Sequence, residues 1–165
     1  MTEYFSAERR LVLRLLDYWQ HVRELRRWPR FDDIDPEALD RDWPNCALLR
    51  WSESTGCFRF TAIGATLDPN ASLLGKAASE CLPNTLIHYA VESVDRVLIK
   101  HIPVSFGGER PKGDETILYR SIVLPLGDQE EAIDGLLIGV NYRLVRSTEE
   151  VAEFPASPVP ERPVT

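Results

Sequence analysis

The spacing of hydrophobic residues changes along this chain, and that change limits the folds it can adopt. Before residue 46 the apolar residues recur at helical spacing, while from Cys46 onward most segments alternate apolar and polar side chains. Helical spacing places apolar side chains on one stripe of a helix, and alternation places them on one face of a strand. The chain is therefore expected to combine an N-terminal helical part with a β-sheet.

The first helix is expected over residues 8–28, with Pro29 closing it because proline cannot continue a helix. A short second helix is expected at 35–39, where Asp35 supplies the N-terminal cap and Pro36 takes the first helical position. The apolar side chains of the first helix share one stripe: Leu11, Val12, Leu15, Tyr18, Trp19, Val22 and Leu25.

Five strands are expected after residue 45. The first two form a hairpin over 46–63, and short helical turns at 68–82 lead into one long helix after Asn84. The remaining strands are expected at 102–107, 115–126 and 133–143, with turns at 107–108 and 127–128. The expected fold is α+β: a five-stranded antiparallel sheet, with short helices and one long helix between strands two and three, preceded by the N-terminal amphipathic helix.

Several segments resemble a family of small, stand-alone bacterial PAS-like sensor domains. They include FRFTAIGATL, LLGK, the long helix, HIPVSF, ILYRSIVLPLGD and IDGLLIGVNYR, and the earlier run LLDYWQHVRELRRWPRFDDIDP is similar too, so the resemblance spans residues 11–143. The chain departs from the family pattern at Thr61, where an arginine is expected before the xxG of the second strand. The resemblance implies a PAS-like core and a role in sensing.

Three regions follow from these patterns. Residues 1–43 are expected to form a helical segment for capping or dimerisation, and residues 44–146 the PAS-like core. Residues 147–165 are expected to be a disordered tail, because four of the twelve prolines fall in the last eleven residues beside several glutamates.

The net charge of −7 argues against binding to nucleic acid or to an anionic membrane, both of which require an excess of Lys and Arg. No apolar run reaches the roughly 20 residues of a membrane span, and the first residues lack the order of a secretory signal. The three cysteines lack CxxC spacing, which suits reduced thiols. We therefore expect a cytoplasmic protein with no membrane or nucleic-acid partner.

No catalytic or cofactor motif stands out in the sequence. GxGxxG, GxSxG and HExxH are missing, and His21, His88 and His101 have no metal-ligand spacing. His88 is expected on the solvent face of the long helix, which argues against haem there and leaves His101 as the alternative. Cys81 lies in SECLPN, unlike the NCRFLQ-like segment of flavin photosensors. We expect no metal, haem or flavin, and leave the cofactor unknown.

Arginines mark one face of the strands as outward: Arg50, Arg59, Arg120 and Arg143. The opposite face is mostly apolar and carries a few polar groups, as small-molecule sites do. The candidate ligand-binding residues on it are Trp51, Phe58, Phe60, Tyr119, Ser121 and Tyr142. The alternative is that each polar group bonds the backbone inside a filled core. Ala47, Leu49, Ala62, Ile117, Val123, Leu136, Ile138 and Val140 complete this face.

The arginine face also holds too many apolar residues to stay open to water: Cys46, Leu48, Ile63, Leu118, Ile122, Leu124 and Leu137. We expect the first helix to cover it, from the same chain or from a second copy. The candidate dimer or partner contacts are Leu11, Leu15, Tyr18, Trp19, Val22 and Leu25.

These features favour a non-catalytic sensory or signalling module that binds a small molecule or a partner protein and passes its signal through protein–protein contacts, as a homodimer. One alternative is a small cavity enzyme of ketosteroid-isomerase-like plan, which would need an inward-facing acid or base that this face lacks. The other is a structural adaptor with no ligand.

Overall fold

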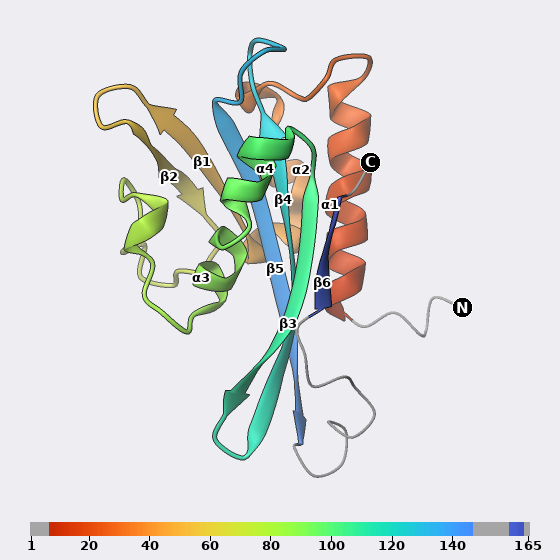
Figure 1. Cartoon of the computed structure of the whole chain (residues 1–165), viewed down its shortest axis with the longest axis vertical. Helices are drawn as coiled ribbons and strands as arrows, with labels where there is room; N and C mark the ends of the chain where they lie inside the picture. The colour runs from red at the N-terminus through yellow and green to blue at the C-terminus, as the bar shows by residue number, and fades with distance from the viewer. Residues whose placement is uncertain (1–6, 147–158, 164–165) are drawn as a thin grey trace.

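A computed structural model describes residues 7–146 and 159–163. It is an α+β fold built on one open antiparallel sheet with strand order β2-β1-β5-β4-β3-β6 (Figure 1). The helical elements are α1 (Ala7–Arg23), η2 (Phe31–Asp33), α2 (Pro36–Leu39), η3 (Asp40–Asn45), η4 (Ala78–Glu80), α3 (Leu86–Val91) and α4 (Val94–Lys100). The strands are β1 (Cys46–Ser52), β2 (Cys57–Ile63), β3 (Val104–Lys112), β4 (Glu115–Leu126), β5 (Gly135–Arg146) and β6 (Val159–Pro163).

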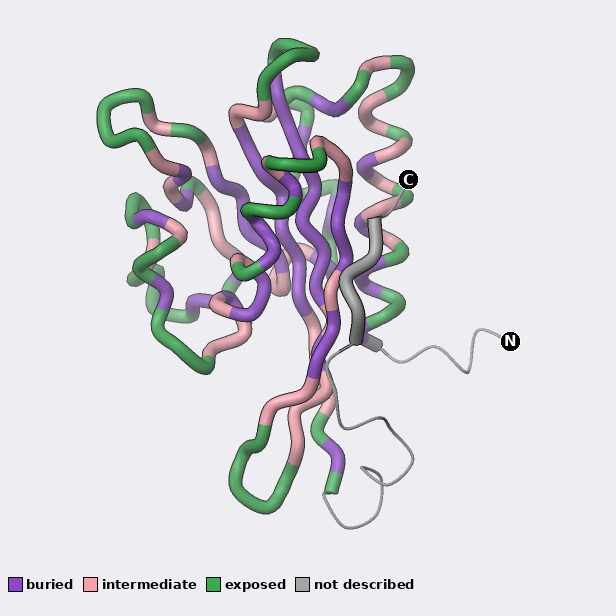
Figure 2. The backbone as a smooth tube through the Cα atoms, viewed as in Figure 1, coloured by how far each residue is buried: buried purple, intermediate pink, exposed green. Residues whose placement is uncertain are grey.

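The sheet separates two hydrophobic clusters, one on each face, as the alternation of the strands predicted. Helices α3 and α4 cover one face and α1 covers the other (Figure 1). The middle strands are buried along most of their length, while the loops at the sheet ends are exposed (Figure 2).

Helix α1 lies on the arginine face of its own sheet. Leu11 and Leu15 are at most 1% exposed, and each fully buried leucine contributes about 1.5–3 kcal/mol relative to an exposed one. The indole of Trp19 donates a hydrogen bond to the carbonyl of Pro125 over 2.8 Å. The guanidinium of Arg14 donates to both carboxylate oxygens of Asp42. The expectation that a helix covers this face is confirmed, and the helix comes from the same chain.

The helix ends earlier than its stripe predicted. Arg23 is its last residue, and Glu24 adopts a positive φ of 54°, which breaks the helical hydrogen-bond series. This turn leaves Leu25 fully exposed and returns Trp28 to the core, where its indole donates to the carbonyl of Gln129. The short second helix is confirmed, and the carboxylate of its N-cap Asp35 accepts from the amide of Glu37.

The β1–β2 hairpin is confirmed, but an irregularity changes which way its end faces. Leu48 pairs with Ala62 while Leu49 pairs with Phe60, so one residue is left over on β2. As a result Ala62, expected on the inner face, packs with the α1 cluster, and Ile63, expected outside, packs with the other cluster. A bulge inverts every side chain beyond it.

The single long helix predicted after Asn84 is two helices, α3 and α4, separated at Glu92 and Ser93. Tyr89 and Val94 are both buried. In one straight helix these two side chains would point about 140° apart, so the break lets both face the sheet. Tyr89, which the helical pattern placed on the solvent side, is 3% exposed.

The turn predicted at 107–108 is also wrong, since both glycines lie inside β3. The chain turns instead at Gly113, which has a φ of 61°. Gly108 serves packing rather than turning: a Cβ there would lie 2.9 Å from the hydroxyl of Tyr119. A side chain at this position would push the tyrosine ring out of its site.

A sixth strand was not predicted. β6 pairs antiparallel with β3 at the edge of the sheet, with an irregularity between Ser105 and Gly107. It falls within residues 147–165, where a disordered tail was expected, and that expectation is wrong for Val159–Pro163. Edge pairing uses backbone groups and tolerates the two prolines of this strand, so composition alone did not reveal it. Residues 147–158 lie outside the described residues.

Candidate functional site

A pocket of about 460 Å³ lies where α3 meets the far ends of β3, β4 and β5. In Figure 1 the β3–β4 hairpin extends below α3, beyond the end of the helix. Eight residues line it: Asn84, Leu86, Tyr89, Arg110, Pro111, Lys112, Ile117 and Tyr142. The volume falls in the range typical of small-molecule sites.

Strand register explains how these residues meet. Arg110 pairs with Ile117, and Lys112 lies two positions further along β3, so both cations share one face. Tyr142 of β5 reaches the same face, two positions before Leu144, which pairs with Ile117. Three strands therefore supply the floor of the pocket.

Helix α3 and the segment before it supply the wall. Thr85 caps this helix, since its hydroxyl accepts a hydrogen bond from the amide of His88 over 3.4 Å. The cap fixes where the first turn begins and so brings Leu86 and Tyr89 together on the side toward the sheet, three positions apart. Asn84, at a positive φ of 65°, completes the wall just before the helix.

Two tyrosines stack at the inner end of this wall. The rings of Tyr89 and Tyr119 have centroids 4.7 Å apart and an interplanar angle of 22°. The guanidinium of Arg110 lies 5.2 Å from the centre of the first ring and 5.4 Å from the second. Both distances allow a cation–π interaction, so the stack holds Arg110 in place.

The hydroxyl of Tyr119 is buried and has no hydrogen-bond partner among the residues that the structure describes. Burial raises the pKa of Tyr119 to about 12, and the positive charge of Arg110 opposes part of that increase. A buried hydroxyl without a partner costs about 1–3 kcal/mol. Buried groups of this kind are uncommon in native proteins, and a functional role is one explanation for them.

Arg110 also has an acidic neighbour. Its guanidinium lies 3.6 Å from a carboxylate oxygen of Glu92, and the two side chains are 29% and 40% exposed. That separation is an ion pair without a hydrogen bond. A second guanidinium nitrogen donates to the backbone carbonyl of Glu109 over 3.0 Å. The ring stack and this backbone bond hold Arg110 whether or not Glu92 is present.

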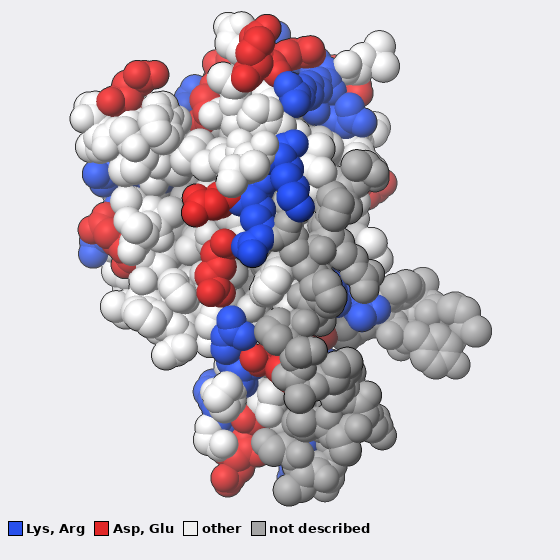
Figure 3. Space-filling view, viewed as in Figure 1, with Lys and Arg blue, Asp and Glu red and all other residues white. Residues whose placement is uncertain are grey.

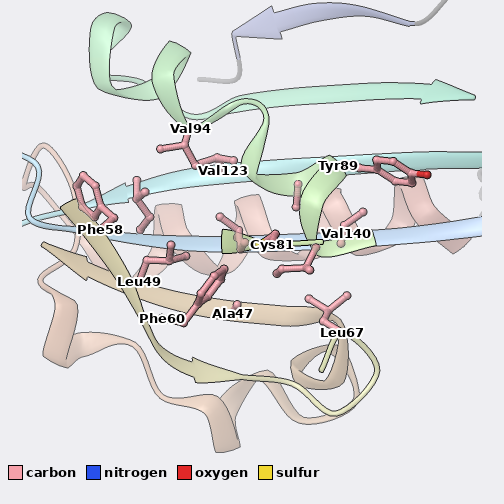
Figure 4. Close-up of a cluster of buried hydrophobic side chains, with 14 of the residues drawn as sticks. Ala47, Leu49, Phe58, Phe60, Leu67, Cys81, Tyr89, Val94, Val123 and Val140 are labelled. Atoms are coloured by element: carbon pink, nitrogen blue, oxygen red, sulfur yellow. The ribbon is translucent and has the colours of Figure 1, made fainter. Parts of the chain in front are cut away.

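The sequence-predicted ligand residues do not form one cavity. Phe58 and Phe60 are buried within the hydrophobic core, together with Leu49 and Val94, and Figure 4 shows their side chains filling the space between sheet and helices. Ser121 is fully buried, and its hydroxyl donates to the carbonyl of Phe106 over 3.3 Å. These three residues are therefore part of a filled core, as in the alternative with no ligand at this face.

Trp51 departs most from the expected inner face, because its side chain is 40% exposed. It lies near the end of β1 and forms a T-shaped contact with Phe58, with ring centroids 5.2 Å apart. Tyr142 does line the pocket, and Tyr119 stacks directly behind its wall. Of the six candidates, Tyr142 alone is a lining residue of this pocket, and Tyr119 lies behind Tyr89.

Five lining residues that carry its chemistry were missed: Asn84, Leu86, Tyr89, Arg110 and Lys112. Tyr89 was missed because the break after α3 could not be seen in the helical pattern. Arg110 and Lys112 were missed because β3 was expected to end at residue 107. The alternation of Phe106, Gly108 and Arg110 was a usable signal, had the two glycines not indicated a turn.

The residues proposed for a dimer contact are mostly used within the chain. Leu11, Leu15 and Trp19 are at most 4% exposed against the sheet, and Val22 is half-buried. The hydroxyl of Tyr18 accepts a hydrogen bond from the amide of Asp35. Leu25 alone of the six is fully exposed.

The cysteines are thiols set apart from this site. Burial raises the pKa of Cys46 well above its usual value and that of Cys81 to about 11, while Cys57 is half-buried. Within residues 7–146 and 159–163 no group of three or more His, Cys, Asp or Glu side chains is placed to hold a metal ion. In the same ranges, no helix has the length and apolar character needed to cross a membrane.

The surface around the pocket carries both charges. In the view of Figure 3, basic and acidic side chains lie next to one another down the middle of the face. Beside the pocket, Arg110 and Glu92 bring opposite charges within 3.6 Å of each other. On this face the charges are mixed, unlike the continuous basic patch that a long polyanion requires.

Comparisons with protein-family models, with curated proteins and with solved structures found no match to this chain.

Proposed function

We propose that this chain is a non-catalytic sensory module of PAS-like type, which binds a small molecule in the pocket beneath α3 and passes the signal on through protein contacts. One observation carries the proposal: a pocket of about 460 Å³ with apolar and aromatic walls and two cations on its floor. Small-molecule sites combine such walls with a few placed polar groups.

The lining supports binding rather than catalysis. It contains tyrosines, an amide, Arg110 and Lys112, and no Asp, Glu or His side chain. A cavity enzyme of ketosteroid-isomerase type requires a carboxylate or imidazole facing its substrate as general base. The PAS-like resemblance and the order of strands and helices support the sensing role, although fold-level likeness is compatible with many functions.

The signal can leave through the elements that form the pocket. A ligand acts by favouring one arrangement of α3 and the β3–β4 hairpin over another. Ile99 on α4 is 79% exposed and Leu82 before α3 is 70% exposed, so apolar contacts for a partner flank the site. We also propose that the chain forms a homodimer and is located in the cytoplasm.

Native mass spectrometry of the full chain, purified from its host without denaturation, tests this function. We expect a small molecule to be retained by the wild-type chain and lost from the Leu86→Trp variant, whose larger side chain fills the pocket. Leu82→Trp is the matched control, since Leu82 lies on the surface outside the lining and should leave the molecule bound.

Retention by both variants would place the ligand elsewhere in the chain. A wild-type chain that retains nothing, even after incubation with host extract, would favour the ligand-free adaptor.

A further inference from the structure

The charged residues of the pocket have one sign. Arg110 and Lys112 are its two charged lining residues, in a chain whose net charge is −7. They lie two positions apart on β3 and face the same side. Two cations, the half-buried Arg110 and the exposed Lys112, thus line one side of the pocket in a chain with excess negative charge, which points to a negatively charged ligand.

The rest of the lining describes the body of that ligand. Leu86, Pro111 and Ile117 offer apolar contacts, and Tyr89 and Tyr142 offer aromatic ones. A compact inorganic anion would gain nothing from these walls, whereas a flat apolar group would bury surface against them. A planar carboxylate also matches the fork of an arginine guanidinium.

Arg110 is already poised for such a partner. Its side chain is held by the two stacked rings and by the carbonyl of Glu109, so its position does not depend on an anion. Glu92 approaches only to 3.6 Å and is 40% exposed. A carboxylate that enters the pocket can therefore form the closer pair and leave Glu92 to the solvent.

We propose that the ligand of this pocket is an organic carboxylate with a flat apolar body, and that Glu92 is the internal counter-ion that this carboxylate displaces from Arg110. The inference rests on the proposed function, since it names the ligand class of the same site.

The displaced residue lies at a point where the fold can respond. Glu92 follows the last residue of α3, and Ser93, which is fully buried, holds the N-cap position of α4 without a side-chain capping hydrogen bond. Release of Glu92 removes one contact between the α3–α4 junction and β3, while the contact between Arg110 and Tyr89 stays. Ligand binding at the sheet is thereby coupled to the relation between two helices.

Two probes of one shape test the ligand class: naphthalene-2-carboxylate and its neutral analogue naphthalene-2-carboxamide. Binding of each to the full chain is measured by calorimetry and located by amide chemical shifts of Tyr89, Ile117 and Tyr142. We expect the carboxylate to bind about 10-fold more tightly than the amide, the size of a charge-assisted hydrogen bond. The Arg110→Gln variant is expected to bind the carboxylate no more tightly than the amide.

The counter-ion is tested by Glu92→Gln. This variant is expected to bind the carboxylate about two- to five-fold more tightly than wild type, a gain that corresponds to the energy of an exposed ion pair. Its affinity for the amide should equal that of wild type. Asp95→Asn removes the same charge from the exposed surface of α4 and should change neither affinity. A gain of affinity cannot result from a loss of folding.

Equal binding of the two probes at the pocket would overturn the ligand class and leave the sensing function standing. Binding of neither probe would count against both. An unchanged carboxylate affinity in Glu92→Gln would overturn the role of Glu92 as counter-ion.

Discussion

The ring of Tyr89, on a short helix, stacks on the ring of Tyr119, in the fourth strand, with centroids 4.7 Å apart. This contact joins α3 to the sheet at the inner end of the pocket, and Arg110 rests on both rings. In Figure 4 the hydroxyl of Tyr89 points away from the other labelled side chains, so the residue closes the core on one side and faces the pocket on the other.

The buried phenol of Tyr119 should ionise at a higher pH than an exposed one. Because burial raises its pKa to about 12, this phenol should ionise at a higher pH than an ordinary one when absorbance at 295 nm is followed. Burial also raises the pKa of Tyr18, so Tyr119→Phe should reduce the absorbance change at high pH by one tyrosine. A raised pKa in the folded state stabilises the fold fully below the ordinary value of 10.0, and this contribution is lost as pH rises through about 12. A titration unchanged by Tyr119→Phe would contradict the burial of this hydroxyl.

Packing of α1 on its own sheet can be tested at one contact. A Cβ on Gly139 would collide with a methyl group of Leu15, which is fully buried. Gly139→Ala should therefore lower the free energy of unfolding by about 1–3 kcal/mol, and Leu15→Ala by about 2–5 kcal/mol through the cavity it leaves. The double variant should lose less than the sum of the two, because the new methyl group occupies part of that cavity.

Urea denaturation of the four proteins completes this double-mutant cycle. Strict additivity of the two single effects would show that Leu15 and Gly139 do not touch, and that α1 lies elsewhere.

Asp68 should stabilise the loop after β2 in a pH-dependent way. Burial opposes its ionisation, but hydrogen bonds from the amides of Leu73 and Ser72 and from the Ser72 hydroxyl outweigh that effect, so the pKa of Asp68 lies below its usual 3.8. A lowered pKa gives stability that is present above pH 3.8 and is lost as the pH falls through the folded-state value.

We expect Asp68→Asn to destabilise the chain by about 1–3 kcal/mol at pH 7, with the difference from wild type shrinking as the solution is acidified. Denaturation at a series of pH values measures this, with Asp95→Asn as an exposed control. A difference that stays constant down to pH values well below 3.8 would be inconsistent with an ionised, hydrogen-bonded Asp68.

The three cysteines should react at different rates with a thiol reagent. Cys57 is half-buried, whereas burial raises the pKa of Cys46 and Cys81 and shields both from solvent. The thiolate is the form that reacts. In the native protein at pH 8 the reagent should therefore modify Cys57 first, and it should modify the other two cysteines only when the protein unfolds. Cys57→Ser should abolish the fast phase in an assay with dithiobisnitrobenzoate. Fast labelling of Cys46 in the native chain would contradict the packing beneath α1.

Much of the fold could be predicted because the residue types differ between the two faces of the strands and of the first helix. The arginines on alternate strand positions indicated the outward face, and the stripe of Leu11 and Leu15 indicated a covering helix. The antiparallel sheet, the first hairpin and the short helix at Pro36 followed from turn and cap residues. These signals are local or periodic, which is why a single sequence contains them.

The site could be predicted only in part, because it depends on departures from periodicity. The break at Ser93 turns Tyr89 inward, and the bulge in β2 exchanges Ala62 and Ile63. Neither changes the residue pattern, since both result from how the elements meet in space. The apolar face of the strands thus became a filled core, and the pocket formed beyond it, at Arg110.

Exchange of Glu92 for a ligand carboxylate at Arg110 is best tested by a crystal structure of the chain soaked with naphthalene-2-carboxylate. We expect the naphthalene ring against Tyr89 and Ile117, its carboxylate within hydrogen-bond distance of the Arg110 guanidinium, and Glu92 moved away from that guanidinium. Naphthalene bound outside this pocket, or bound in it with the Arg110–Glu92 pair intact at 3.6 Å, would rule out this exchange.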